Sequence, residues 1–185
     1  MNKTLCTLAI GIAVAGNAHA DNGLRFDARL EGGDAAGRVI ETDAKGKAKF
    51  EVIDGGTALH YEVKVQKIFN VFMAHIHIAA EPFGNGPIAF WFVPTTPPMA
   101  PDSNLEEESK GVLAAGVIMN DNQLVGPLAP NPENPEGTGI QGLINAILDN
   151  RAYVVVHTSD LDNTNNVVPG VAGDSPPGEL RGQIE

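Results

Sequence analysis

Three histidines are the side chains of this sequence whose types and spacing best suit chemistry. His75 and His77 stand two residues apart in a β-prone stretch, and His157 ends another such stretch far along the chain. Residues two apart on a strand point to the same face, so we expect the first two imidazoles to lie side by side. An H-x-H pair joined by a distant third histidine is a recurring way to bind zinc or copper. A hydrogen-bonded polar cluster, or histidines exposed on a sheet face, would give the same short pattern.

A carboxylate near the end of the chain could complete this site. An antiparallel pairing with Val156 opposite Leu180 gives the last two strands one continuous apolar face. This register places Glu179 opposite His157, with Arg181 two residues further along on the same polar face. Glu179 would then be a fourth metal ligand, or would accept a hydrogen bond from a ligating imidazole. A slip of one residue would exchange the two faces, so the prediction depends on the register.

The other polar residues form no recognisable catalytic motif. The sequence contains neither G-x-S-x-G nor H-E-x-x-H. Residues 160–166 resemble the start of a calcium loop but lack the glycine and the glutamate of an EF-hand. His60 shares its strand parity with Glu62 and Lys64, so we expect it to face solvent. We therefore expect a non-enzymatic binding protein; a dismutase-like metalloenzyme and an envelope or matrix interaction module are the alternatives.

The N-terminus has the features of a secretion signal over residues 1–20. A positive residue is followed by a short apolar run and by the small-x-small cleavage pattern of Ala18, His19 and Ala20. No apolar run is long enough to span a bilayer. We therefore expect a periplasmic or secreted protein of residues 21–185, not inserted in the membrane. Cleavage after Ala18 instead would make His19 the N-terminal residue, which could bind copper through its amine and ring.

Composition limits the partners that this protein could have. The chain carries 23 acidic and 12 basic residues, a formal net charge of −11. This acidity argues against binding to nucleic acid or to anionic membranes, because both attract basic surfaces. The only cysteine, Cys6, would leave with the leader, so the mature chain would have no disulfide. The expected partner is therefore an extracytoplasmic ligand or protein whose identity the sequence does not give.

The hydrophobic pattern is mainly of period two, which predicts an all-β fold. The predicted strands cover residues 24–30, 49–53, 57–65, 71–78, 87–93, 111–119, 151–158 and 179–184. One short helix is predicted from the spacing of Ile140, Leu143, Ile144, Ile147 and Leu148, with Thr138 as its N-cap. Long loops rich in proline, asparagine and glycine cover residues 94–110, 126–139 and 159–178. The pattern is typical of an antiparallel β-sandwich or barrel with one short helix and long loops, and it places Trp91 in the core.

Several motifs together resemble the CHRD (chordin) domain. They are GKAKF at 46–50, GTALHY at 56–61, AHIH at 74–77, NGPI at 85–88, AYVVVHT at 152–158 and GELRGQI at 178–184. The resemblance covers residues 24–184 and implies an extracytoplasmic β domain, found singly in bacteria and repeated in animal chordins, without an established enzymatic activity. By motif it carries over His75, His77 and His157, with Glu179 and Arg181 from the closing segment. The chain departs from the family in its longer loops and in Ile78, where glycine is usual.

Overall fold

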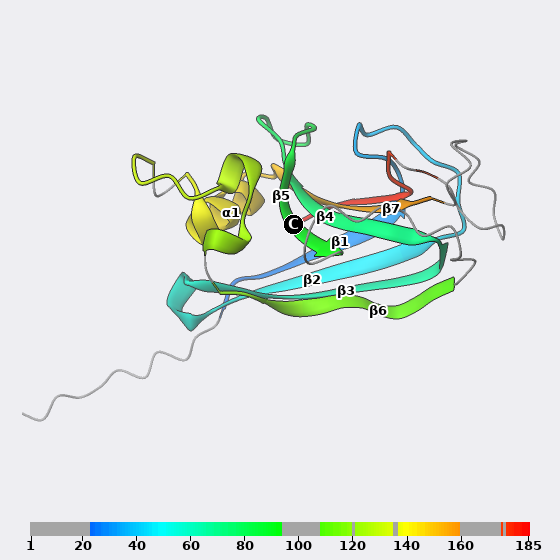
Figure 1. The fold of residues 1–185 in the computed structure, drawn as a ribbon, viewed down its shortest axis with the longest axis horizontal. Coiled ribbons are helices and arrows are strands. Elements are labelled where there is room, and N and C mark those ends of the chain that lie inside the picture. The colour runs from blue at the N-terminus through cyan, green and yellow to red at the C-terminus, as the bar shows by residue number, and fades with distance from the viewer. Residues whose placement is uncertain (1–22, 94–107, 120, 135–136, 160–174, 176) are drawn as a thin grey trace, which may run out of the picture.

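Eight antiparallel strands form one sheet that curls into a nearly closed barrel, accompanied by one short helix (Figure 1). The computed structural model describes residues 23–93, 108–119, 121–134, 137–159, 175 and 177–185. The elements are β1 (Arg25–Gly32), β2 (Lys45–Ile53), β3 (Ala58–Phe69), β4 (Val71–Ile78), β5 (Ile88–Val93), β6 (Glu108–Ile118), α1 (Gly139–Leu148), β7 (Ala152–Thr158) and β8 (Leu180–Gln183). The sheet order is β5-β4-β7-β8-β1-β2-β3-β6. The prediction of an all-β fold with one helix is confirmed.

Alternation of apolar and charged residues places one face of β1, β2 and β3 in the barrel core. In β1, Phe26, Ala28 and Leu30 are buried while the residues between them are exposed. The same period-two rule buries every second residue of β3 from Leu59 to Val65, as the sequence predicts. This regular half of the barrel supports the other half, where the histidines lie.

Strand β2 begins earlier than the sequence predicts. Its first inward residues are Gly46 and Ala48, which lie opposite Val65 and Val63 of β3. Small side chains carry little β-strand signal in a sequence, although here they let the larger valines of the neighbouring strand fill the core. The start of β2 at Lys45 therefore reflects packing between strands rather than local preference.

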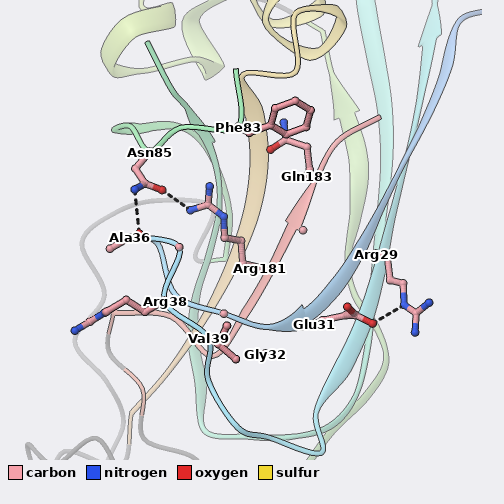
Figure 2. Close-up of a pocket in the computed structure, with 13 residues that line it drawn as sticks. Arg29, Glu31, Gly32, Ala36, Arg38, Val39, Phe83, Asn85, Arg181 and Gln183 are labelled. Carbon is pink, nitrogen blue, oxygen red and sulfur yellow. Dashed lines mark hydrogen bonds and ion pairs between the residues drawn. The ribbon is translucent and has the colours of Figure 1, made fainter. Parts of the chain in front are cut away.

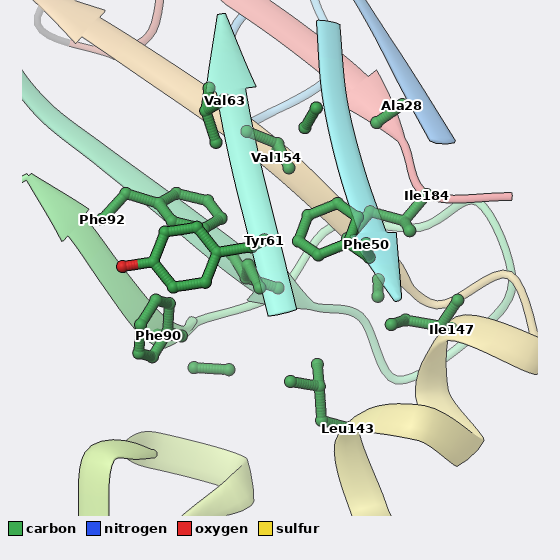
Figure 3. Close-up of a cluster of buried hydrophobic side chains, with 14 of the residues drawn as sticks. Ala28, Phe50, Tyr61, Val63, Phe90, Phe92, Leu143, Ile147, Val154 and Ile184 are labelled. Carbon is green, nitrogen blue, oxygen red and sulfur yellow. The ribbon is translucent and has the colours of Figure 1, made fainter. Parts of the chain in front are cut away.

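Aromatic rings fill the middle of the core (Figure 3). The ring of Tyr61 lies 5.5 Å from that of Phe90 and 5.1 Å from that of Phe92, measured between centroids. Helix α1 contributes Leu143 and Ile147 to the same cluster, and both are almost fully buried. The helix thus packs its apolar stripe against the core, whereas Leu148, predicted to belong to that stripe, is 54% exposed at the helix end.

The N-terminus of α1 is capped by a residue that the sequence did not indicate. Thr138 occupies the N-cap position, but its side chain makes no capping hydrogen bond; its hydroxyl donates to the carbonyl of Asn134. The free backbone N–H of Ile140 instead donates to Oδ1 of Asp121, at 2.8 Å. The predicted cap by Thr138 is therefore wrong in its chemistry, because a carboxylate from a distant turn takes the place of the local hydroxyl.

Removing this distant cap should destabilise the fold. We expect Asp121→Ala to lower the free energy of unfolding by about 1 kcal/mol, the usual cost of a lost N-cap. Asp121→Asn keeps an acceptor oxygen and should cost less than the alanine variant. Urea denaturation of the three proteins measures the difference, and equal stability of wild type and Asp121→Ala would contradict the capping role.

Strands β4 and β7 are buried on both faces, unlike the strands of the regular half. Every residue of β7 is buried, as is every residue of β4 from Ala74 to Ile78. The two strands are neighbours in the sheet, with β5 beyond β4 and β8 beyond β7. A polar group on the outer face of these strands is therefore shielded from water.

Several features predicted from the sequence lie on residues that the structure does not describe. The leader at 1–20, the calcium-like segment at 160–166 and most of the loops at 94–110 and 159–178 lie outside the described residues. Within the described part, no helix is long and apolar enough to cross a membrane.

Candidate metal centre

The three predicted histidines converge on the outer face of β4 and β7. His75 and His77 alternate with core residues along β4, and the antiparallel register places His157 of β7 opposite Met73, two residues before His75. One nitrogen from each ring lies within 4.8 Å of one nitrogen of each other ring. The exposed fractions are 1% for His75 and 6% for each of the other two. Three imidazoles in this arrangement could hold a metal ion.

Hydrogen bonds fix the orientation of His77. Its Nδ1 lies 2.9 Å from the carbonyl oxygen of Gly86. Because a carbonyl oxygen only accepts, Nδ1 carries the proton and Nε2 keeps its lone pair. Nε2 is buried and has no hydrogen-bond partner among the described residues. A ring fixed by a backbone carbonyl in this way is the usual arrangement of a metal-ligating histidine.

His75 and His157 make one close nitrogen contact. Nδ1 of His75 lies 3.2 Å from Nε2 of His157. Nε2 of His75 is buried without a partner among the described residues. The contact is a hydrogen bond if one of the two nitrogens is protonated.

The surroundings of His75 and His77 favour the uncharged form of both rings. Burial is the main reason that the pKa of His75 falls to about 3, and the neighbouring His157 and His77 contribute in the same direction. Burial also lowers the pKa of His77, against the opposing effect of its hydrogen bond to Gly86, and the charge of Arg181 adds to the lowering. Neutral imidazole is the form that binds metals, so the site does not have to lose a proton first.

Aromatic side chains surround the cluster, and one of them was assigned differently from sequence. Trp91, predicted to be core, lies on the outer face of β5 with its ring edge-on to His75 at 4.1 Å between centroids. The ring of Phe72 lies 6.3 Å from that of His157. A β-bulge between Val71 and Met73 brings it there, because one extra residue changes the alternation.

Tyr153 was missed by the sequence analysis and connects the cluster to β8. Its ring is stacked on His77 at 5.1 Å, and its hydroxyl accepts from the N–H of Gly86 at 2.9 Å. The guanidinium of Arg181 covers the same ring at 3.6 Å. Because β7 lies between β4 and β8, the phenol ring lies between the imidazole and the guanidinium. Tyr153 shares its parity with His157 along β7, so the sequence did contain a signal for its position.

Arg181 ties β8 to two surface segments (Figure 2). Its Nη1 donates to the carbonyl of Ala35 at 2.8 Å and to Oδ1 of Asn85 at 2.9 Å, and its Nη2 donates to the carbonyl of Gly84 at 2.8 Å. Asn85 donates in turn to the carbonyl of Ala36. Arg181, Asn85 and Ala36 line an open pocket of about 570 Å³. Arg181 therefore holds the turn that carries Gly86, the partner of His77.

Glu179 does not belong to the group of three histidines. The predicted register is confirmed, since Val156 pairs with Leu180. However, the carboxylate accepts hydrogen bonds from the hydroxyls of Thr42 at 2.6 Å and Thr158 at 2.8 Å. Thr158 follows His157 on the strand and so points to the opposite face. Burial raises the pKa of Glu179, although the two hydroxyl hydrogen bonds oppose this.

Comparison with known proteins identifies the family. The sequence matches the family model of the CHRD domain over residues 26–164. The chain belongs to the CHRD-domain family. No curated protein and no solved structure matches it. The match to the CHRD domain includes all three clustered histidines and ends before Glu179 and Arg181, which lie at the end of the chain.

Proposed function

We propose that this CHRD-domain protein is an exported, non-enzymatic protein that binds copper or zinc through His75, His77 and His157. The observation that carries the proposal is the pair of buried Nε2 atoms, on His75 and His77, that have no hydrogen-bond partner among the described residues. A buried polar atom without a partner costs about 1–3 kcal/mol, so it is rare in a folded protein. A metal ion would satisfy these nitrogens.

The composition of the cluster supports binding rather than catalysis. Among the described residues, no aspartate, glutamate or cysteine joins the three histidines in a group of close ligand atoms. Acid–base catalysis needs a titratable group near the reacting atoms, and the neutral imidazoles are the only candidates here. The deep burial of all three rings favours retention of an ion for storage or structural support.

Metal titration of the secreted protein, purified without a histidine tag, tests this function. We expect stoichiometric binding of one copper or zinc ion, and a rise in stability of about 2.7 kcal/mol when the free ion is present at a hundred times its Kd. Thermal unfolding and elemental analysis measure the two effects. His77→Phe should abolish both the binding of the ion and the rise in stability.

The matched control is His60→Phe, since His60 is exposed on β3 outside the cluster. This variant should bind metal as the wild type does. A wild-type protein that stays metal-free, with a melting curve unchanged by added copper and zinc, would refute the proposed function.

A further inference from the structure

The charge balance around the histidine cluster distinguishes between metal ions. Histidine ligates metals as neutral imidazole, and the described part of the chain adds no anionic ligand to the group of His75, His77 and His157. Glu179, the nearest candidate from sequence, is bound by threonine hydroxyls on the other face of the sheet. A divalent ion bound by three imidazoles would therefore keep its full double charge in a buried site.

A positive group lies close to the same site. The guanidinium of Arg181 is separated from the His77 ring only by the ring of Tyr153. The Coulomb repulsion of a bound cation grows in proportion to the charge of that cation, and the desolvation cost of a buried ion grows with the square of its charge. Both effects penalise a divalent ion more than a monovalent one.

The strand register places a soft donor, Met73, on the face of β4 that carries His75 and His77. Met73 precedes His75 by two residues on β4 and is paired with His157 across the strands, so it shares the face of the cluster. Its side chain is half-buried. Thioether sulfur is a soft ligand that suits monovalent copper, whereas the usual zinc ligands in proteins are thiolate, imidazole and carboxylate.

We propose that this site selects monovalent copper, Cu(I), with the Met73 thioether as its fourth donor. The proposal rests on the proposed function, because it presumes that the three histidines bind a metal. It deepens that function by naming the oxidation state and the additional ligand. Neutral nitrogen and sulfur donors would leave a bound Cu(I) with a single positive charge, the smallest that a metal at this site could carry.

Competition titrations under anaerobic conditions test the preference. The full secreted chain is titrated with Cu(I) against a chromophoric Cu(I) chelator, and in parallel with Zn(II) and Cu(II) against chelators of known affinity. We expect Cu(I) to bind more tightly than Zn(II) by at least about a hundredfold, equivalent to about 2.7 kcal/mol. A tighter affinity for either divalent ion than for Cu(I) would overturn the preference.

Methionine variants test the fourth donor. Met73→Leu conserves volume at a half-buried position and should fold normally. It should weaken Cu(I) binding about tenfold and change Zn(II) binding less than about twofold, as expected for one weak soft ligand. Copper-edge X-ray absorption of the Cu(I) protein should show a sulfur neighbour that Met73→Leu loses.

Two further variants complete the design. Met119→Leu changes a methionine that is 69% exposed at the end of β6 and should leave all affinities unchanged. Met73→Glu supplies the missing negative charge and should shift the preference toward Zn(II). Equal Cu(I) affinities of Met73→Leu and Met119→Leu would overturn the thioether assignment. Failure of the wild type to bind any of the three ions would refute the proposed function itself.

Discussion

Replacing Arg181 with leucine should lower the free energy of unfolding by about 3 kcal/mol, because charge-assisted hydrogen bonds and a stacked guanidinium are lost together. The leucine would leave the carbonyl of Gly84 without the arginine donor and that of Ala35 with the longer hydrogen bond from the Tyr153 hydroxyl, and it would uncover the Tyr153 ring. The turn that carries Gly86 would also lose its attachment to β8. Guanidinium chloride denaturation measures the loss, and we expect metal affinity to fall with it.

Another arginine of the barrel serves as a matched control. Arg25 lies on β1 and pairs with Glu51, but its side chain is 77% exposed. Exposed ion pairs contribute at most about 1 kcal/mol, so Arg25→Leu should have a small effect. Arg181→Lys should be intermediate, since an ammonium group cannot reproduce the planar fork of the guanidinium. If Arg181→Leu lowers the free energy of unfolding no more than Arg25→Leu does, the hydrogen bonds of Arg181 do not stabilise the fold.

The metal-free protein should become less stable as the pH falls below about 6.5. In the folded chain the pKa of His75 is about 3, against an ordinary value of 6.5. Between these values the unfolded chain binds a proton at this residue and the folded chain does not, so acid favours unfolding. The contribution of His75 to the free energy of unfolding is fully present above its ordinary pKa. It is lost at about 1.4 kcal/mol per pH unit as the pH falls. The loss between pH 6.5 and 4.5 is about 2 kcal/mol for His75 alone.

Denaturation curves in EDTA at several pH values measure the slope of the free energy of unfolding against pH. His75→Gln should reduce the slope, whatever its effect on stability at pH 7, and His60→Gln should not. Glu179 contributes with the opposite sign, because burial raises the pKa of its carboxyl and the folded chain then holds a proton that the unfolded chain has released. In a Glu179→Gln background the histidine effect should therefore be clearer. If the slope is the same in the wild type and in His75→Gln, the lowered pKa of His75 is not the cause of the pH dependence.

The local pattern of the sequence predicted the strands well where one face is buried and the other is charged. The period-two alternation of β1 and β3 gave both the strands and their inward residues. It also gave the pairing of Val156 with Leu180, because only one register keeps a continuous apolar face. Prediction failed where that rule is interrupted. Trp91 lies against His75 and not in the core, and Asp121 from a distant turn takes the capping hydrogen bond predicted for Thr138.

The sequence by itself determined that His75 and His77 share a face, since alternation is a property of every extended backbone. It also determined the family, through motifs spread along the chain. Only the tertiary structure decided that β7 lies beside β4 and brings His157 to the pair, because no local pattern encodes which strands are neighbours. The same holds for Gly86 as the partner of His77 and for the turning of Glu179 toward Thr158. These contacts join distant segments, so they depend on strand order and bulges, which are set by the packing of the whole barrel.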